Sequence, residues 1–113
     1  MAQIEALVIS CLNDELDVPA YGEKPESPPE RYVVVEKTGG DITNRIHHAE
    51  IAVDSYAPTL YEASLLDEEV TDAMDMLTFE DEISGVDFVS SHNHTNPTMK
   101  QPRYQSLFEV TYY

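Results

Sequence analysis

Histidine pairs are the first groups in this sequence whose type and spacing could do chemistry. His92 and His94 have H-x-H spacing, which on a strand places both imidazoles on one face, and His47 and His48 form a second pair. Zinc needs three or four ligands, usually with a second pair at a defined spacing, but the residues after His94 are threonine, asparagine and proline. We therefore expect solvated histidines and no metal site.

Nucleophiles and phosphate-binding loops are the next candidates for chemistry. Cys11 lies on an apolar helical stripe, so we expect a buried, inert thiol. No serine lies in a G-x-S-x-G elbow, and Gly39-Gly40 is followed by an acid instead of the lysine of a phosphate-binding loop. The acidic residues also lack the spacing of an EF-hand loop. The sequence thus predicts no catalytic residue, no cofactor and no enzymatic activity.

Negative charge dominates the composition, with 22 acidic residues against 6 basic ones and a formal net charge of −16. Such a chain is not expected to bind nucleic acid by neutralising phosphates. Nine of the acids lie between Glu62 and Glu82, a stretch without lysine or arginine. We expect this stretch to form a helix whose outer face is acidic. The candidate residues of that acidic face are Asp67, Glu68, Glu69, Asp72 and Asp75.

Two amphipathic helices are predicted by apolar residues that recur with helical spacing. Thr59-Leu60-Tyr61-Glu62 matches a capping box and marks the start of the second helix. The stripe of the first helix is Ile4, Leu7, Val8, Cys11 and Leu12. The stripe of the second is Ala63, Leu66, Val70, Ala73, Met74 and Leu77.

Strands are predicted between and after these helices by β-branched runs and by alternation of apolar and polar residues. Thr38-Gly39-Gly40-Asp41 predicts a hairpin turn, and loops are expected at residues 22–30 and 92–102. The predicted extended segments are residues 17–21, 31–37, 45–57, 86–90 and 103–113. The order is α-β-β-β-α-β-β. It predicts an α+β fold in which both helices pack on one face of a mostly antiparallel, mixed sheet whose other face is wet.

Length and cysteine content bound the organisation of the chain. The 113 residues fit one domain, residues 1–113, with one core. A single cysteine excludes an intrachain disulfide and fits a reducing compartment. The sequence lacks both a run of about 20 apolar residues and the pattern of a signal peptide, so we expect a cytosolic protein when it is made.

Aromatic residues near the end of the chain are candidates for contacts with other proteins. Tyrosine combines a large apolar body with a polar tip, which suits an interface. Tyr104, Tyr112 and Tyr113 lie on the last predicted strand, and His92 and His94 lie in the loop before it. We regard these five residues as candidate intersubunit or partner contacts.

Three passages resemble a group of siphophage and prophage tail-terminator (tail-completion) proteins. Residues 29–40 (PERYVVVEKTGG) are similar to that group's PERFVVIEKTGG passage. Residues 51–57, followed by residues 61–63, are similar to its QSYA…YEA passage, and residues 103–111 match its RYQ-x-x-F-D/E-hydrophobic-T ending. The resemblance covers nearly the whole chain, although the loop at residues 92–99 departs from the group's pattern.

The resemblance implies both a fold and a function. The implied fold has two helices on one side of a mixed sheet. The implied function is a homo-hexameric ring that caps the tail tube, ends its growth and offers a surface to head-completion or connector proteins. The implied partners are further copies of the chain and the major tail tube protein, while genome DNA passes through without specific binding. The implied location is the head-proximal end of the virion tail, after assembly in the host cytoplasm. The nine uncompensated acids add the hypothesis that the second helix or another acidic surface lines the lumen.

Two other functions fit the same pattern. A head-tail connector or stopper protein of similar size would bind the portal or adaptor side instead of the tail tube. An acidic regulatory protein would mimic DNA and occupy a basic partner. The binding partner discriminates among the three.

Overall fold

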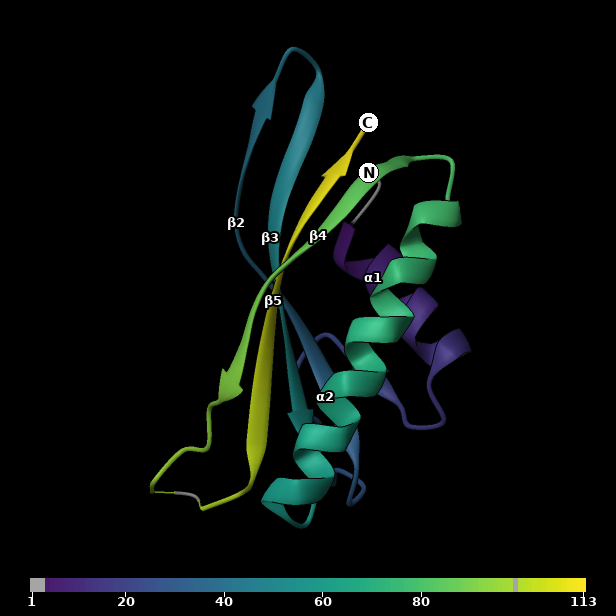
Figure 1. Ribbon diagram of the computed structural model, residues 1–113. Helices are drawn as coiled ribbons and strands as arrows, with labels where there is room; N and C mark the ends of the chain where they lie inside the picture. The colour runs from purple at the N-terminus through teal and green to yellow at the C-terminus, as the bar shows by residue number, and fades with distance from the viewer. Residues whose placement is uncertain (1–3, 99) are drawn as a thin grey trace.

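Two helices and a five-stranded mixed sheet follow one another in the predicted order, so the predicted α+β fold class is confirmed. The computed structural model describes residues 4–98 and 100–113 (Figure 1). Its elements are α1 (Ile4–Glu15), β1 (Ala20–Tyr21), β2 (Tyr32–Thr43), β3 (Ile46–Tyr56), α2 (Leu60–Met74), the 3-10 helix η1 (Asp75–Phe79), β4 (Ile83–Asn93) and β5 (Arg103–Tyr112).

Both helices form where the sequence predicts them. The Thr59 hydroxyl accepts a hydrogen bond from the Glu62 backbone N–H at 3.1 Å, which confirms the predicted cap of α2. Every member of the predicted α2 stripe is buried, and the stripe continues onto η1. In α1, Ile4, Val8 and Leu12 are buried, while Leu7 and Cys11 are partly buried against the same core.

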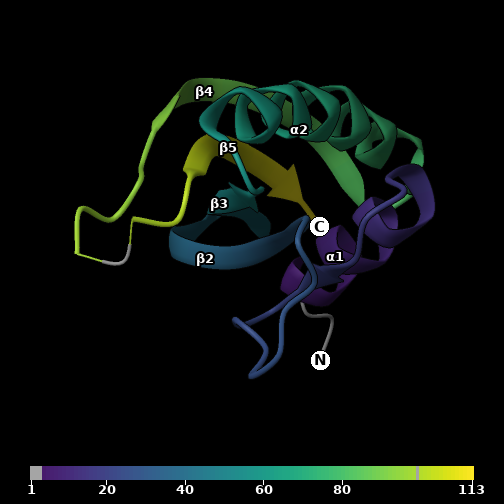
Figure 2. The ribbon, with the colours of Figure 1, turned by 90° about the horizontal axis from the view of Figure 1, so that it is seen from below.

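The sheet has the order β1-β2-β3-β5-β4, with β1 parallel to β2 and every other pair antiparallel. Figure 2 shows the strands curving around the side that carries α1 and α2. Helix α2 packs on β3, β4 and β5, and α1 packs on β1, β2 and α2. The core lies between these layers, so one sheet face is covered by helices and the opposite face, hereafter the open face, is not.

The first hairpin differs from its predicted geometry. Instead of turning at residues 38–41, β2 continues to Thr43, and the turn lies at Asn44 and Arg45 with φ of 51° and 69°. Two consecutive positive φ values are typical of a two-residue type I′ turn. Neither Gly39 nor Gly40 has a positive φ, and the pairing register instead shifts between Lys37 and Gly39. Thr38 is therefore the extra residue of a β-bulge, and the glycines after it pair with Glu50 and Ala49 of β3.

Strand β4 is longer than predicted, running from Ile83 to Asn93 instead of over residues 86–90. Ser84-Gly85 does not end it, because the register shift between Ile83 and Gly85 absorbs the irregularity. His92 therefore lies on a strand and not in the predicted loop at residues 92–102. Met99 of that loop lies outside the described residues.

The open face is less exposed to solvent near the start of β5 than the sequence predicts. Ala52, Asp54 and Tyr56 point away from the helices but are buried. The Tyr56 ring stacks on Tyr32 at 4.6 Å, and the Arg103 guanidinium lies 5.6 Å from the Tyr56 centroid. Long side chains from neighbouring strands thus cover this half of the open face.

Candidate interaction surfaces

The β2–β3 hairpin extends beyond the helices (Figure 1). We call residues 38–48 the arm. Strand β1 pairs only with Val33 and Val34, so the β2 side of the arm has no strand partner within the described part of the chain. Ile42, near the tip, is 64% exposed. A two-stranded ribbon with an exposed isoleucine suits a contact with another molecule.

Carboxylates line up on the open face at the base of the arm. Glu50 of β3 pairs with Glu109 of β5, which pairs with Asp87 of β4, and alternation places all three on the open face. His48 Nδ1 lies 4.0 Å from a Glu109 carboxylate oxygen, and the Thr38 hydroxyl donates to Glu50 at 2.7 Å. Like charges directly opposite one another destabilise a sheet, so this surface favours a basic or screened environment.

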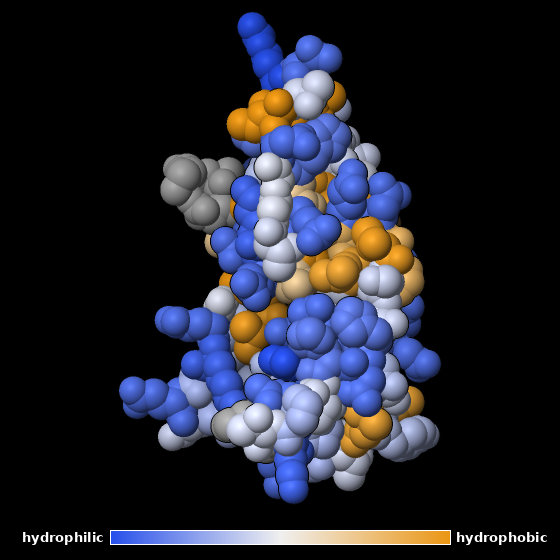
Figure 3. Space-filling model, turned by 90° about the vertical axis from the view of Figure 1, so that its left-hand side faces the viewer, coloured by the Kyte–Doolittle hydropathy of each residue, from blue (hydrophilic) through white to orange (hydrophobic). Residues whose placement is uncertain are grey.

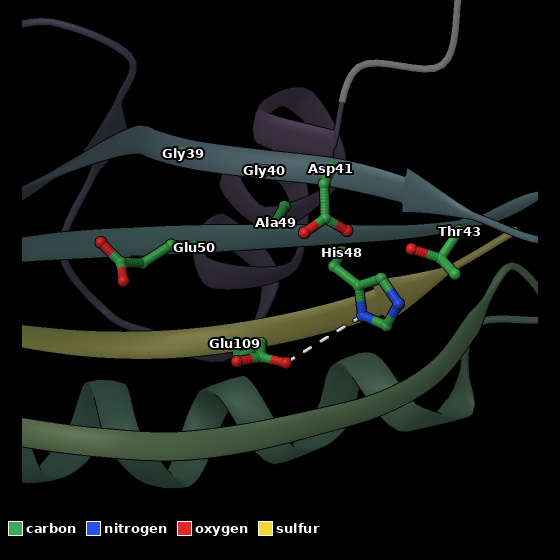
Figure 4. A pocket seen from close by; sticks show the side chains of 8 residues that line it. All are labelled: Gly39, Gly40, Asp41, Thr43, His48, Ala49, Glu50 and Glu109. Atoms are coloured by element: carbon green, nitrogen blue, oxygen red, sulfur yellow. Dashed lines mark ion pairs between the residues drawn. The ribbon is translucent and has the colours of Figure 1, made fainter.

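This region is a shallow, polar concavity of about 400 Å³ (Figure 4). Asp41 and His48 extend from the arm, and Glu50 and Glu109 lie along its base. Viewed from the open side, the molecule is mostly hydrophilic, with hydrophobic groups near the end of the arm and over the middle of the sheet (Figure 3). The open face is therefore a second acidic surface besides α2.

The acidic face predicted on α2 forms with four of its five residues. Glu68, Glu69, Asp72 and Asp75 are exposed, and Glu69 lies 3.6 Å from the Arg31 guanidinium. The expectation for Asp67 is wrong, because Asp67 is only 4% exposed. Asp67 follows Ala63 by four positions and so lies on the same helix face as the buried stripe. This spacing could have predicted the burial of Asp67 from the sequence.

Asp67 instead anchors α2 to the sheet. Its carboxylate accepts hydrogen bonds from the hydroxyls of Ser91 on β4 and Ser106 on β5. The nearby Ser55 hydroxyl is also buried but has no hydrogen-bond partner among the described residues. A buried carboxylate with two hydroxyl donors is a structural group.

A groove lies between α2 and the edge strand β4. We call it the α2–β4 groove; its volume is about 370 Å³, and it is lined by Asp67, Glu68, Thr71, Asp72, Phe88 and Ser91. The Phe88 side chain is 52% exposed and contacts Phe108 edge-on, with ring centroids 5.8 Å apart. The groove thus combines an exposed aromatic ring with uncompensated carboxylates.

The predicted contact residues near the end of the chain divide into two groups. Tyr113, His92 and His94 are exposed, and Tyr104 is half-buried. Tyr112 is buried and its ring stacks on His47 at 4.8 Å, so the expectation that it is free for a partner is wrong in this chain. Its alternation with Val110 and Phe108 places it on the core face.

A polar cluster surrounds Asp54 on the open face. Asp54 accepts a hydrogen bond from Gln105 at 3.0 Å and lies 4.0 Å from Arg103. Arg103 also donates to the Tyr56 hydroxyl at 3.0 Å and to the His94 carbonyl at 2.8 Å. Burial raises the pKa of Asp54, and the Gln105 hydrogen bond and the Arg103 charge partly offset this. No local sequence pattern predicted this cluster, since its members come from two separate strands, β3 and β5, and from the loop after β4.

The histidines and the cysteine that were considered for chemistry do not come together in one site among the described residues. The rings of His92 and His94 lie 5.4 Å apart, but within residues 4–98 and 100–113 no group of three His, Cys, Asp or Glu side chains could hold a metal ion. Cys11 is half-buried instead of fully buried, and burial, followed by the charges of nearby acids, raises the pKa of its thiol. A raised thiol pKa disfavours the reactive thiolate. No helix among the described residues is long and apolar enough to cross a membrane.

A comparison with protein families finds no family model that matches the chain, and none of the curated proteins matches it. The function proposed below therefore depends on the sequence passages and on the surfaces described above.

Proposed function

We propose that this protein assembles with copies of itself into a six-membered ring that caps the tail tube of a long-tailed phage, ends tube growth and joins the tail to the head. The sequence resemblance supports this function. The observation that carries it in the molecule is the arm, which extends beyond its own helices and exposes Ile42. Such a projection suits a ring of identical subunits, because each subunit in a ring joins one surface patch to a different patch on its neighbour.

Surface charge is compatible with a channel for DNA. Acidic residues are exposed on α2, and Glu36, Glu50, Asp87 and Glu109 lie on the open face. Either surface, turned toward the lumen, would repel phosphates, so that DNA slides through without binding. The partners are then the tail tube protein on one side and head-completion proteins on the other, at the head-proximal end of the tail.

Binding assays test this function against its alternatives. Purified protein is mixed with tail tube protein, with portal-side connector protein, or with a basic DNA-binding protein in the presence of competitor DNA. We expect binding to tube ends. Binding to the portal side alone would indicate a connector, and displacement by DNA from the basic protein would indicate a DNA mimic.

A further inference from the structure

The arm lacks the strong negative charge of the rest of the protein. Within residues 38–48, Arg45 balances the single acid Asp41, so the formal net charge of the arm with neutral histidines is zero. The whole chain, by contrast, has a net charge of −16. The arm is therefore repelled less than the remainder of the chain by acidic surfaces of other copies, and Arg45 at its tip is attracted to them.

Arg45 occupies an unfavourable backbone conformation at the tip of the arm. Its φ of 69° is one that glycine adopts most easily in such turns. Its side chain forms no ion pair and no hydrogen bond with any described residue. The Arg45 guanidinium at the tip of the arm is therefore free to contact a carboxylate of another molecule.

The α2–β4 groove has the complementary properties. Glu68 and Asp72 are exposed there and form no ion pair with the described residues. Phe88 supplies an apolar surface, and Val89 beside it is 54% exposed. An isoleucine and an arginine separated by three positions on a hairpin match an aromatic ring bordered by carboxylates.

Two other contacts are disfavoured. Pairing of β4 with an edge strand of another copy is interrupted by its register shifts at residues 83–85 and 88–90, which are typical of protected edges. The acidic groove between α1 and α2 contains Glu69, which Arg31 already neutralises in part. The α2–β4 groove is the acidic site that offers both unpaired carboxylates and an exposed aromatic ring.

We propose that the arm of one copy docks in the α2–β4 groove of a second copy, with Ile42 against Phe88 and Arg45 between Glu68 and Asp72. This inference rests on the proposed ring and identifies the contact that would build it. The two patches lie on different parts of one chain, so the contact is heterologous, and repetition with the right rotation closes a ring.

Paired cysteines test the contact directly. In a Cys11→Ala background, Asn44→Cys on the arm is combined with Thr71→Cys in the groove, and the protein is mildly oxidised. Because each copy then has one cysteine on either side of the contact, we expect a ladder of covalent oligomers on a non-reducing gel. The matched control combines Asn44→Cys with Ser27→Cys in the exposed loop, and we expect no ladder. Absence of the ladder with Thr71→Cys, or an equal ladder with the control, would overturn the proposal.

Complementary variants provide a second test. Ile42→Asp removes the arm contact, and Phe88→Asp removes the groove contact. Because both side chains are exposed, we expect both variants to fold, and circular dichroism checks this. Each variant alone should associate at least about tenfold more weakly than the unmodified chain in analytical ultracentrifugation. An equimolar mixture retains one intact arm and one intact groove, so it should form dimers and stop there. Association of either variant at the unmodified strength contradicts the contact.

The outcomes separate this contact from the proposed function. Rings on tube ends without a cysteine ladder would reject the arm contact and leave the capping function intact. A ladder in a protein that never binds tube ends would support the contact and reject the capping function.

Discussion

At the scale of single residues, Asp67 distinguishes the structural part of the acidic helix from its surface. Glu68 is its neighbour in sequence and has the same chemistry, but it is exposed, whereas Asp67 is buried and accepts hydrogen bonds from the buried Ser106 and the exposed Ser91. Hydrogen bonds to a charged group contribute about 1.5–3 kcal/mol, and buried donors that lose their acceptor are costly.

We predict that Asp67→Ala lowers the free energy of unfolding by about 1–3 kcal/mol, because it leaves the buried Ser106 hydroxyl without an acceptor and removes the link to Ser91 on β4. Glu68→Ala is the matched control and should change stability by no more than about 0.5 kcal/mol. Urea denaturation of both variants measures the difference. Equal effects of the two substitutions would show that Asp67 does not anchor α2.

Asp54 predicts a pH dependence of stability. Burial raises the pKa of this carboxyl above the ordinary value of 3.8, so the folded protein holds the proton more tightly than the unfolded chain does. The contribution of Asp54 to stability is therefore most favourable below pH 3.8 and declines as pH rises through the raised pKa. Each unit of the shift corresponds to about 1.4 kcal/mol.

We expect Asp54→Asn to be more stable than the unmodified protein at pH 7, and we expect this advantage to shrink as the pH falls through the raised pKa of Asp54 and to level off below pH 3.8. Denaturation curves of both proteins across this range measure the difference. Glu26→Gln, in the exposed loop, controls for the loss of a negative charge. An advantage that is constant with pH, or one that Glu26→Gln reproduces, would contradict the role of burial.

At the scale of elements, the arm depends on its two glycines in different ways. A Cβ added to Gly40 would lie 2.7 Å from the His48 carbonyl oxygen, whereas a Cβ added to Gly39 meets nothing within 4 Å. We predict that Gly40→Ala destabilises the hairpin by about 1–3 kcal/mol through this overlap, and that Gly39→Ala has little effect. Thermal denaturation checks both variants, and equal melting temperatures would contradict the close approach.

Arg45→Gly should separate stability from assembly. Glycine relieves the positive φ at this turn position, so the isolated chain should become more stable by up to about 1 kcal/mol. The same substitution removes the guanidinium that we place between Glu68 and Asp72, so association should weaken. Melting temperature and sedimentation are measured on the same sample. A variant that is less stable, or one that associates as before, contradicts this prediction.

Element order was predictable from sequence because helices and strands have distinct apolar periods. The α2 stripe and its capping box are local patterns, and both are confirmed. The turn was misplaced because Gly39-Gly40 is a strong turn signal, whereas the two positive φ values at Asn44 and Arg45 are set by pairing along the whole hairpin. The Asp54 cluster and the α2–β4 groove depend on contacts between distant segments, which no local pattern reveals.

At the scale of the whole molecule, the net charge opposes the proposed assembly. Copies with a net charge of −16 repel one another over distances set by the Debye length, which falls from about 30 Å at 0.01 M salt to about 8 Å at 0.15 M. The contact of Arg45 with two carboxylates acts at short range and is screened less. We predict that association strengthens over this range of salt in sedimentation experiments. Dissociation upon addition of salt would contradict the claim that repulsion between copies outweighs the attraction of Arg45 to the two carboxylates.

The central claim is that this protein ends the growth of a phage tail tube. Electron microscopy of the particles made when its gene is deleted from the phage tests that claim most directly. We predict overlong tails without heads, and we predict that supplying the unmodified protein in trans restores tails of normal length. Tails of normal length that fail to join heads, or intact infectious particles, would contradict it.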